Sequence, residues 1–575
     1  MNQATEPAVE PDASAAAPGS TTRRWPGRAL VFLPELVAVL CTLWVFRTVI
    51  VRGRLPGNLG DARWTIALHE HWYRVWTGQE SIRDLFFYYP ARNTLGSSDA
   101  FLVQGQLYSL ARLLGVSPVD AWVVAGIGFF LIGALGVAAL SRRVLDSRWL
   151  QVAFVVLCVC SYAMQVGFGH VQLFGMLSAS WIFVGLHDLV GGRHVRRGVA
   201  LLAVAPPLLA LSSWYAMVLT GLILVFLGAA LALLSSRRGI ATAIRLVVAD
   251  LWSTLRSGFG IAGAVLMVVL WAAVVWVYLP SMGLLPPPGW LDVQIYSPRW
   301  SDLWNASEGG GGIWSSLYTA LHFDSSVNDQ RYGFTPIVFV VFATAALGVL
   351  RVAVRRRPRP AVRPYPIGPA GLLAAVLAVV GVLALFLMDE RGFSLFRVLW
   401  QLVPGMNSIR SPYRVMIILF GLVVLVVLRG FELWWNGRFA AGPAWRRAVT
   451  LGLAGVVTAT MVVEMQRPVD AVWTRAELLS PALVGQIDRI RADCDALILL
   501  SADPATPAWL TSIDAVILAA ESGVPTPQGY SRADPIGYPD QDSGVDPAAL
   551  LRWMRDQGFD GRVCSVSAAG DLRQL

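Results

Sequence analysis

Long apolar runs recur along this sequence, and they limit the chain to one broad class of fold. Runs such as 119–140 and 412–433 carry few charges, and about 18 or more such residues are enough to cross the hydrocarbon core of a membrane. A soluble chain of 575 residues with 55% hydrophobic and only 14% charged residues could not bury so much apolar surface. The sequence therefore predicts an α-helical polytopic membrane protein.

The apolar runs predict about eleven transmembrane helices. The expected spans are approximately 29–51, 119–140, 149–167, 171–190, 198–213, 215–234, 258–279, 333–352, 367–388, 412–433 and 447–465.

Arginine clusters between these spans predict the orientation of the chain. The first cluster is Arg23, Arg24 and Arg28, and later ones lie within 142–148, 193–197, 237–238, 351–363 and 438–447. Successive clusters leave room for two spans, so all of them fall on one side, which the positive-inside tendency identifies as cytoplasmic. The N-terminus is then cytoplasmic, and an odd number of spans puts the C-terminus outside. Because the basic residues form no extended face, the net charge of +9 predicts no nucleic-acid partner.

This orientation divides the chain into three expected parts. Residues 1–28 are a disordered cytoplasmic tail, 29–466 are the membrane domain with large outer loops at 52–118 and 280–332, and 467–575 are a small extracytoplasmic α/β domain. Cys494 and Cys564 both belong to the exported domain. In an oxidising compartment they form either a disulfide or two buried free thiols.

The first outer loop holds a dense group of ionisable and aromatic residues. From Asp61 onward, apolar and aromatic residues recur at helical spacing, which predicts an amphipathic helix lying at the membrane surface. Asp61 lies at or near the start of this helix, so it is a helix cap, a catalytic base, or both. Asp99 has similar alternatives, as a helix N-cap or as a second carboxylate of a site.

Further polar residues are candidates for binding an anionic substrate, each with a structural alternative. Arg63 would hold a phosphate or form a surface salt bridge. Glu70 and His71 would contact substrate or form the polar face of an interfacial helix. Arg410 and Arg414 lie at the outer mouth of a span and, if the helix includes both, place two guanidiniums on one helical face, for a phosphate or as snorkelling anchors.

Two candidates lie elsewhere in the sequence. His170 occupies a short outer turn and is either a ligand or a hydrogen-bonded turn residue. Tyr530 follows a turn-rich stretch of the exported domain that could fold back over a membrane cavity as a lid or an acceptor contact.

Several short motifs resemble those of a known superfamily. They are GDARW from Gly60, ALHEHW from Ala67, FFYYPARNTLGSSDAFL from Phe86, GFGHVQL around His170, NSIRSPYR at Asn407 to Arg414 and GVPTPQGYS at Gly523 to Ser531. Together they resemble uncharacterised bacterial members of the GT-C superfamily of membrane glycosyltransferases. The resemblance implies Asp61 as catalytic base, a polyprenyl-phosphate sugar as donor, and an extracytoplasmic glycan, lipid or protein as acceptor. It also implies inversion at the anomeric carbon and a place in the bacterial plasma membrane.

Two other classes of function remain open at this point. A transporter or flippase of a lipid-linked or polar substrate would carry ionisable residues deep within several spans. A non-catalytic envelope assembly protein would have scattered rather than convergent outer-loop carboxylates. No cofactor motif is present, although Asp61, Asp99, His69 and His71 offer ligand types that a divalent cation could use.

Overall fold

The computed structural model describes most of the chain. It covers residues 29–575 except 58, 167–169, 193, 287–288, 305–313, 315–319, 321–332, 357–366, 390, 404, 439–442, 466–471, 502–505, 532–533 and 540–543. The expected N-terminal tail and most of the second outer loop lie outside the described residues.

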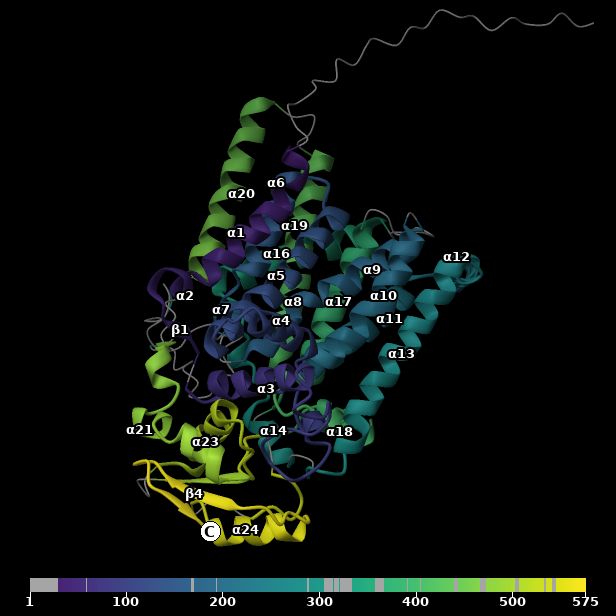
Figure 1. Cartoon of the computed structure of the whole chain (residues 1–575). Coiled ribbons are helices and arrows are strands. Elements are labelled where there is room, and N and C mark those ends of the chain that lie inside the picture. The colour runs from purple at the N-terminus through teal and green to yellow at the C-terminus, as the bar shows by residue number, and fades with distance from the viewer. Residues whose placement is uncertain are drawn as a thin grey trace, which may run out of the picture.

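The larger part of the structure is a bundle of long apolar helices (Figure 1). Among the described residues, eight helical segments are long and apolar enough to cross a membrane: Pro118–Val144 (α5), Val171–Gly191 (η4, α8 and α9), Val195–Ser212 (α10), Trp214–Leu234 (α11), Gly258–Ser281 (α13), Pro369–Phe386 (α17), Pro412–Asn436 (within η8 and α19) and Ala444–Met465 (α20). The other three expected spans coincide with shorter apolar helices: Leu33–Val45 (α1), Arg148–Val159 (α6) and Pro336–Val352 (within α16). The predicted class is confirmed, while the count of eleven stays a prediction.

Two groups of ion pairs involve buried charges of the span helices. The Arg429 guanidinium in α19 (Val415–Arg438) lies 2.7 Å from the Asp146 carboxylate and also contacts Glu432. The Asp188 carboxylate in α9 (Ser180–Gly191) receives hydrogen bonds from Arg143 and Arg197. Arg429 and Glu432 lie in one helix, while the contacts of Arg429 with Asp146 and of Asp188 with Arg143 and Arg197 link separate segments of the chain. These charges are thus accounted for as packing contacts.

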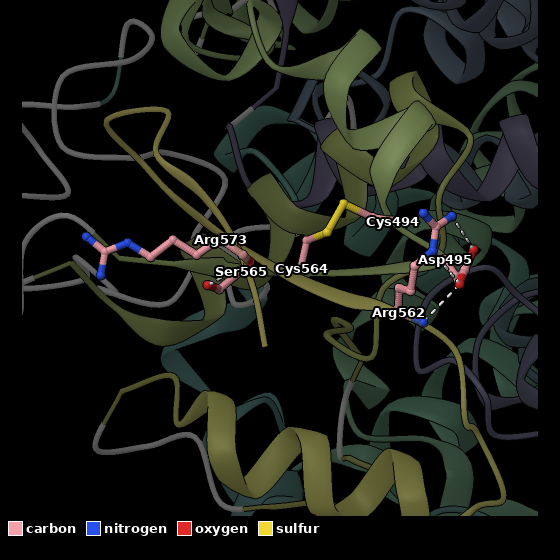
Figure 2. Close-up of a disulfide and its surroundings, with 6 residues drawn as sticks. All are labelled: Cys494, Asp495, Arg562, Cys564, Ser565 and Arg573. Atoms are coloured by element: carbon pink, nitrogen blue, oxygen red, sulfur yellow. Dashed lines mark hydrogen bonds and ion pairs between the residues drawn. A yellow bond between two sulfur atoms is a disulfide. The ribbon is translucent and has the colours of Figure 1, made fainter.

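Residues 472–575 contain the predicted α/β elements. Strand β3 (Ala496–Leu500) pairs in parallel with β4 (Val563–Ser567), and β5 (Leu572–Gln574) pairs antiparallel with β4. The helices of this region are α21 (Pro481–Val484), α22 (Ile487–Asp493), α23 (Ala508–Ser522) and α24 (Pro547–Asp556). A disulfide links Cys494, just after α22, to Cys564 in β4, across 70 residues of sequence (Figure 2). Of the two alternatives for these cysteines, the structure has the disulfide.

The C-terminal region is joined to the first outer loop by backbone and side-chain contacts. Short strands β1 (Leu55–Pro56) and β2 (Val472–Trp473) pair antiparallel. The backbone N–H of Tyr89 donates to the Thr526 carbonyl at 3.0 Å, and the Thr526 N–H donates to the Phe86 carbonyl at 2.9 Å. These contacts hold the two segments together although they are more than 400 residues apart in sequence.

The helix predicted from Asp61 is present as α3 (Asp61–Trp76), but it does not lie on an open surface. It packs on α4 (Leu102–Leu113) and α5 on one side and on α23 of the C-terminal region on the other. Polar residues that an interfacial helix would expose are buried, including Glu70 and His71. The polar face of α3 is thus covered by a region encoded far downstream, while the position of this helix at the membrane surface stays a prediction.

Candidate functional site

A cavity of about 960 Å³ lies between α3, the ends of several span helices and the C-terminal region. Six of the nine residues singled out in the sequence line it: Asp61, Asp99, His170, Arg410, Arg414 and Tyr530. They come from five separate stretches of the chain, so the fold gathers them from long range.

Asp61 opens α3 and faces this cavity. Gly60 is the N-cap, so Asp61 is the first helical residue. One carboxylate oxygen, Oδ1, accepts a hydrogen bond of 3.2 Å from the Tyr530 hydroxyl. The other, Oδ2, lies 3.8 Å from Nε2 of His170. The side chain remains 21% exposed, so a substrate in the cavity can reach the carboxylate.

Tyr530 is held in place by the two residues before it. Both polar ends of the Gln528 amide are hydrogen-bonded to the backbone of Leu499 in β3, at 2.6 and 3.0 Å. Gly529 rests on the ring of Tyr88, and a Cβ added at Gly529 would lie 2.5 Å from that ring. Burial raises the pKa of the Tyr530 hydroxyl, and the adjacent Asp61 carboxylate raises it further. The hydroxyl therefore stays protonated and acts as a hydrogen-bond donor.

Asp99 and Arg414 form a second charged group within the cavity. Asp99 accepts a hydrogen bond of 2.6 Å from the backbone N–H of Trp214, the first residue of α11. Burial raises the pKa of Asp99 to about 6, while the Trp214 hydrogen bond and the Arg414 charge act in the opposite direction. Asp99 thus accepts a hydrogen bond from the N-terminus of α11, and it also lines the cavity.

The two arginines do not share a helical face as expected. Ser411 precedes Pro412 and has φ −112° and ψ 78°, since a residue before proline avoids the helical region. Arg410 therefore lies in a bend, and α19 begins only at Val415. Each guanidinium instead lies over a tyrosine ring: Arg410 is 4.9 Å from the centroid of Tyr296, and Arg414 is 5.1 Å from that of Tyr215.

One edge of the cavity is apolar and exposed. Val275 and Leu279 of α13, with Met282 just beyond it, line the cavity although each side chain is more than half exposed. Because α13 is a candidate membrane span, this edge would open toward lipid. An acyl or prenyl chain could leave the cavity there without entering water.

The remaining walls combine aromatic rings with polar groups that have no assigned partner. Trp64 and Trp509 flank Tyr530, with ring centroids 5.6 and 6.1 Å from its ring. The Ser411 hydroxyl and the Gln172 side-chain carbonyl are buried and lack a hydrogen-bond partner among the described residues. Rings and unsatisfied polar groups of this kind suit a carbohydrate.

Three of the predicted ligands lie outside the cavity, in contacts between α3 and its neighbours. Arg63 forms an ion pair of 2.6 Å with Asp514 of α23. Glu70 accepts hydrogen bonds from the Tyr108 hydroxyl and from the Arg112 guanidinium.

His71 lies 2.7 Å from the Glu80 carboxylate. The structure thus buries Arg63, Glu70 and His71 in packing contacts, and none of the three lines the cavity. This differs both from the expected substrate contacts and from the expected surface salt bridge and interfacial polar face.

The four residues considered for a divalent cation do not converge. His69 is buried against the rings of Phe101 and Tyr108, and burial lowers its pKa to about 4. Within the described part of the chain, no group of three or more His, Cys, Asp and Glu side chains could hold a metal ion.

Several cavity residues were not singled out in the sequence: Trp64, Trp214, Tyr215, Tyr278, Tyr296 and Trp509. Aromatic residues are common at membrane interfaces, so their type alone did not distinguish them. The position of Trp214 and Tyr215 could have indicated these two residues as candidates, because they begin a span directly after Ser212 and Ser213.

Comparisons with known proteins found similarity only among solved structures. No protein-family model matches the sequence, and no curated protein matches it. The oligosaccharyltransferase of Archaeoglobus fulgidus, in a complex with Zn and sulfate, aligns over 93% of this chain and 68% of its own, with 12% identity and a TM-score of 0.44. The mycobacterial arabinofuranosyltransferase AftD aligns over 94% of this chain and 37% of its own, with 14% identity and a TM-score of 0.49.

These structural neighbours are glycosyltransferases. A second structure of the archaeal enzyme, AglB, holds an inhibitory peptide and a dolichol-phosphate, and aligns with 12% identity and a TM-score of 0.43. The neighbours belong to the superfamily that the sequence motifs resemble. At such identities and scores the likeness concerns the arrangement of helices, so we derive the function from the cavity itself.

Proposed function

We propose that this protein is an inverting membrane glycosyltransferase of the GT-C type, which transfers a sugar from a polyprenyl-phosphate donor to an extracytoplasmic acceptor. The single observation that carries the proposal is the makeup of one cavity. A carboxylate, two guanidiniums and an exposed apolar edge of a span helix all line it. These are the base, the phosphate ligands and the lipid path that such a reaction needs.

Asp61 would act as the general base. As the acceptor hydroxyl oxygen attacks the anomeric carbon, its proton would pass to the Asp61 carboxylate. The bond from the anomeric carbon to the phosphate oxygen breaks at the same time, and its electron pair leaves with the lipid phosphate. The protonated Asp61 would then lose its proton to water. Tyr530, donating to Oδ1 of Asp61, would orient the carboxylate, and Oδ2, which also faces Nε2 of His170, would take the proton of the incoming hydroxyl.

Arg410 and Arg414 would stabilise the phosphate as it gains charge. Their stacking on Tyr296 and Tyr215 fixes each guanidinium before substrate arrives, so little reorganisation is needed. The charge of Arg414 acts on Asp99, whereas that of Arg410 acts on Tyr530. Arg410 would therefore supply more of the net positive charge, and Arg414 mainly hydrogen bonds.

The aromatic residues near Tyr530 support a sugar-binding part of the cavity. Trp64 comes from α3, while Trp509 and Tyr530 come from the C-terminal region. Rings at this position would stack on the donor sugar or on an acceptor glycan. The proposal thus gives the C-terminal region a part in substrate binding.

The test is transfer by purified protein in lipid nanodiscs, supplied with polyprenyl-phosphate hexoses and pentoses and with an acceptor extract from the cell envelope. Release of polyprenyl phosphate is measured. We expect Asp61→Asn to reduce release by roughly 10²- to 10⁴-fold, the range for loss of a general base. Asp560→Asn is the matched control, because the Asp560 side chain is 95% exposed. Comparable rates for wild type and Asp61→Asn on an accepted donor would remove the proposed base.

A further inference from the structure

Helix α12 (Arg237–Leu255) was not expected from the sequence, which shows no span there, and it is not part of the cavity. It links α11 to α13 through very short connections, because α11 ends at Leu234 and α13 begins at Gly258. Both ends of α12 are therefore fixed within a few residues of a candidate membrane span.

The position of α12 relative to the cavity follows from these two spans. Trp214 and Tyr215 at the start of α11 line the cavity, and so do Leu279 and Ser281 at the end of α13. Because α11 leaves the cavity side and α13 returns to it, α12 must lie at the opposite side of the membrane. Figure 1 shows α12 at the end of α13 that is far from the C-terminal region.

The outward surface of α12 carries an apolar stripe. One side of the helix packs on α9, α10 and α13. Ile244, Val248 and Trp252 follow one another at a spacing of four residues on another side, and each is more than half exposed. Three large apolar side chains in a row would be unfavourable in water.

A stripe of arginine borders the apolar stripe. At 3.6 residues per turn, Arg238, Arg245 and Arg256 fall within about 20° of one another around the helix axis. All three are exposed, and the Arg256 guanidinium lies 4.8 Å from the ring centroid of Trp252. With Arg237, the segment 237–256 has four arginines against one acidic residue, Asp250.

We propose that α12 is a docking surface for anionic phospholipid at the membrane face opposite the cavity. The apolar stripe would enter the boundary between headgroups and acyl chains, and the arginine stripe would contact lipid phosphates. The attachment of both helix ends to spans holds α12 at the depth where such contacts form. This proposal does not depend on the reaction assigned to the cavity.

The first test compares lipids retained by the full-length protein. Wild type and the variant Arg238→Gln/Arg245→Gln/Arg256→Gln are purified from micelles with equal amounts of phosphatidylglycerol and phosphatidylcholine, and bound lipids are counted by mass spectrometry. One arginine near an anionic surface favours binding about fivefold. We therefore expect the ratio of bound phosphatidylglycerol to bound phosphatidylcholine to be at least tenfold lower in the triple variant than in wild type. The control, Arg489→Gln/Arg552→Gln/Arg573→Gln, removes three exposed arginines of the C-terminal region and should retain the wild-type ratio. An equal ratio in wild type and the α12 variant would overturn the proposal.

A second test does not require the triple variant to fold. Spin labels are attached at Val248→Cys and at Thr242→Cys, which lies on the far side of the exposed surface. In nanodiscs that contain phosphatidylglycerol, we expect the label at 248 to be relaxed by oxygen and the label at 242 by a water-soluble nickel chelate. A label at 248 that is relaxed mainly by nickel would contradict lipid contact. Shielding from both reagents only in native membranes would assign the surface to a protein partner instead, and would equally overturn the proposal.

Discussion

Replacement of Asp99 by asparagine should stabilise the protein at neutral pH, although Asp99 lies in the candidate site. The pKa of Asp99 is raised from its ordinary value of 3.8 to about 6, chiefly because the carboxyl group is buried. A shift of about two units corresponds to about 3 kcal/mol, at 1.36 kcal/mol per unit. Asparagine removes this cost, and its side-chain oxygen can still accept the hydrogen bond from the Trp214 N–H.

The pH dependence of this effect has a definite sign. Below about pH 4, Asp99 is protonated in both the folded and the unfolded chain, and the variant gains nothing. Between about pH 4 and 6 the unfolded chain has lost the proton and the folded chain has kept it, so stability of the wild type falls as pH rises. Above about pH 6 the difference is constant, with Asp99→Asn more stable by up to about 3 kcal/mol.

Thermal unfolding in detergent, followed by intrinsic fluorescence at pH 4.5 and 7.5, measures this difference. Because unfolding entropy grows with chain length, about 3 kcal/mol corresponds to a Tm increase of about 2 °C or more. We expect Asp99→Asn to exceed wild type by this amount at pH 7.5 and by much less at pH 4.5. The exposed Asp560→Asn serves as control at both pH values. A difference in Tm that does not change with pH, or a less stable variant at pH 7.5, would refute the buried-charge argument.

Three further changes test the site and its support. Tyr530→Phe removes one hydrogen bond to a carboxylate, worth about 1.5–3 kcal/mol. We expect kcat to fall by roughly 10- to 150-fold while the KM for donor changes little. An unchanged kcat would exclude Tyr530 as a positioning residue. Arg414→Gln should raise the donor KM or lower kcat at least tenfold, and wild-type kinetics for both constants would exclude phosphate contact. Joint replacement of Cys494 and Cys564 by serine opens a loop of 70 residues and should destabilise the C-terminal region by about 4 kcal/mol. We expect faster proteolysis of that region. Proteolysis at the wild-type rate would contradict this expectation.

The sequence was sufficient for the class of fold and for the disulfide alternatives, because span length and cysteine placement are local properties. Asp61 could also be found, since it lies at the start of a helix that the apolar spacing of the first outer loop predicts. Arg63, Glu70 and His71 lie one to three turns further along the same helix, yet they do not line the cavity. Helical spacing gives the faces of α3 but not what covers them, and α23 covers one.

Arg410 and Arg414, unlike the three residues of α3, line the cavity although their expected backbone geometry does not occur. The expected geometry was wrong because Pro412 interrupts the helix, yet both arginines line the cavity through separate tyrosine contacts. Helix α12 was missed for another reason: it is too polar for a span, and no hydropathy window distinguishes an interfacial helix from a loop. Long-range contacts, such as that of Tyr530 with Asp61, could not be derived from local pattern at all.

The hydrogen bond between Tyr530 and Asp61 joins residues 469 positions apart, and this has a bearing on biogenesis. A nascent chain that has inserted every apolar helix still lacks Tyr530, Trp509 and the strands that hold them. The pocket is completed only when the late-synthesised region has packed onto a helix made near the beginning of translation. An unfinished polypeptide therefore lacks part of the cavity wall until the C-terminal region is in place.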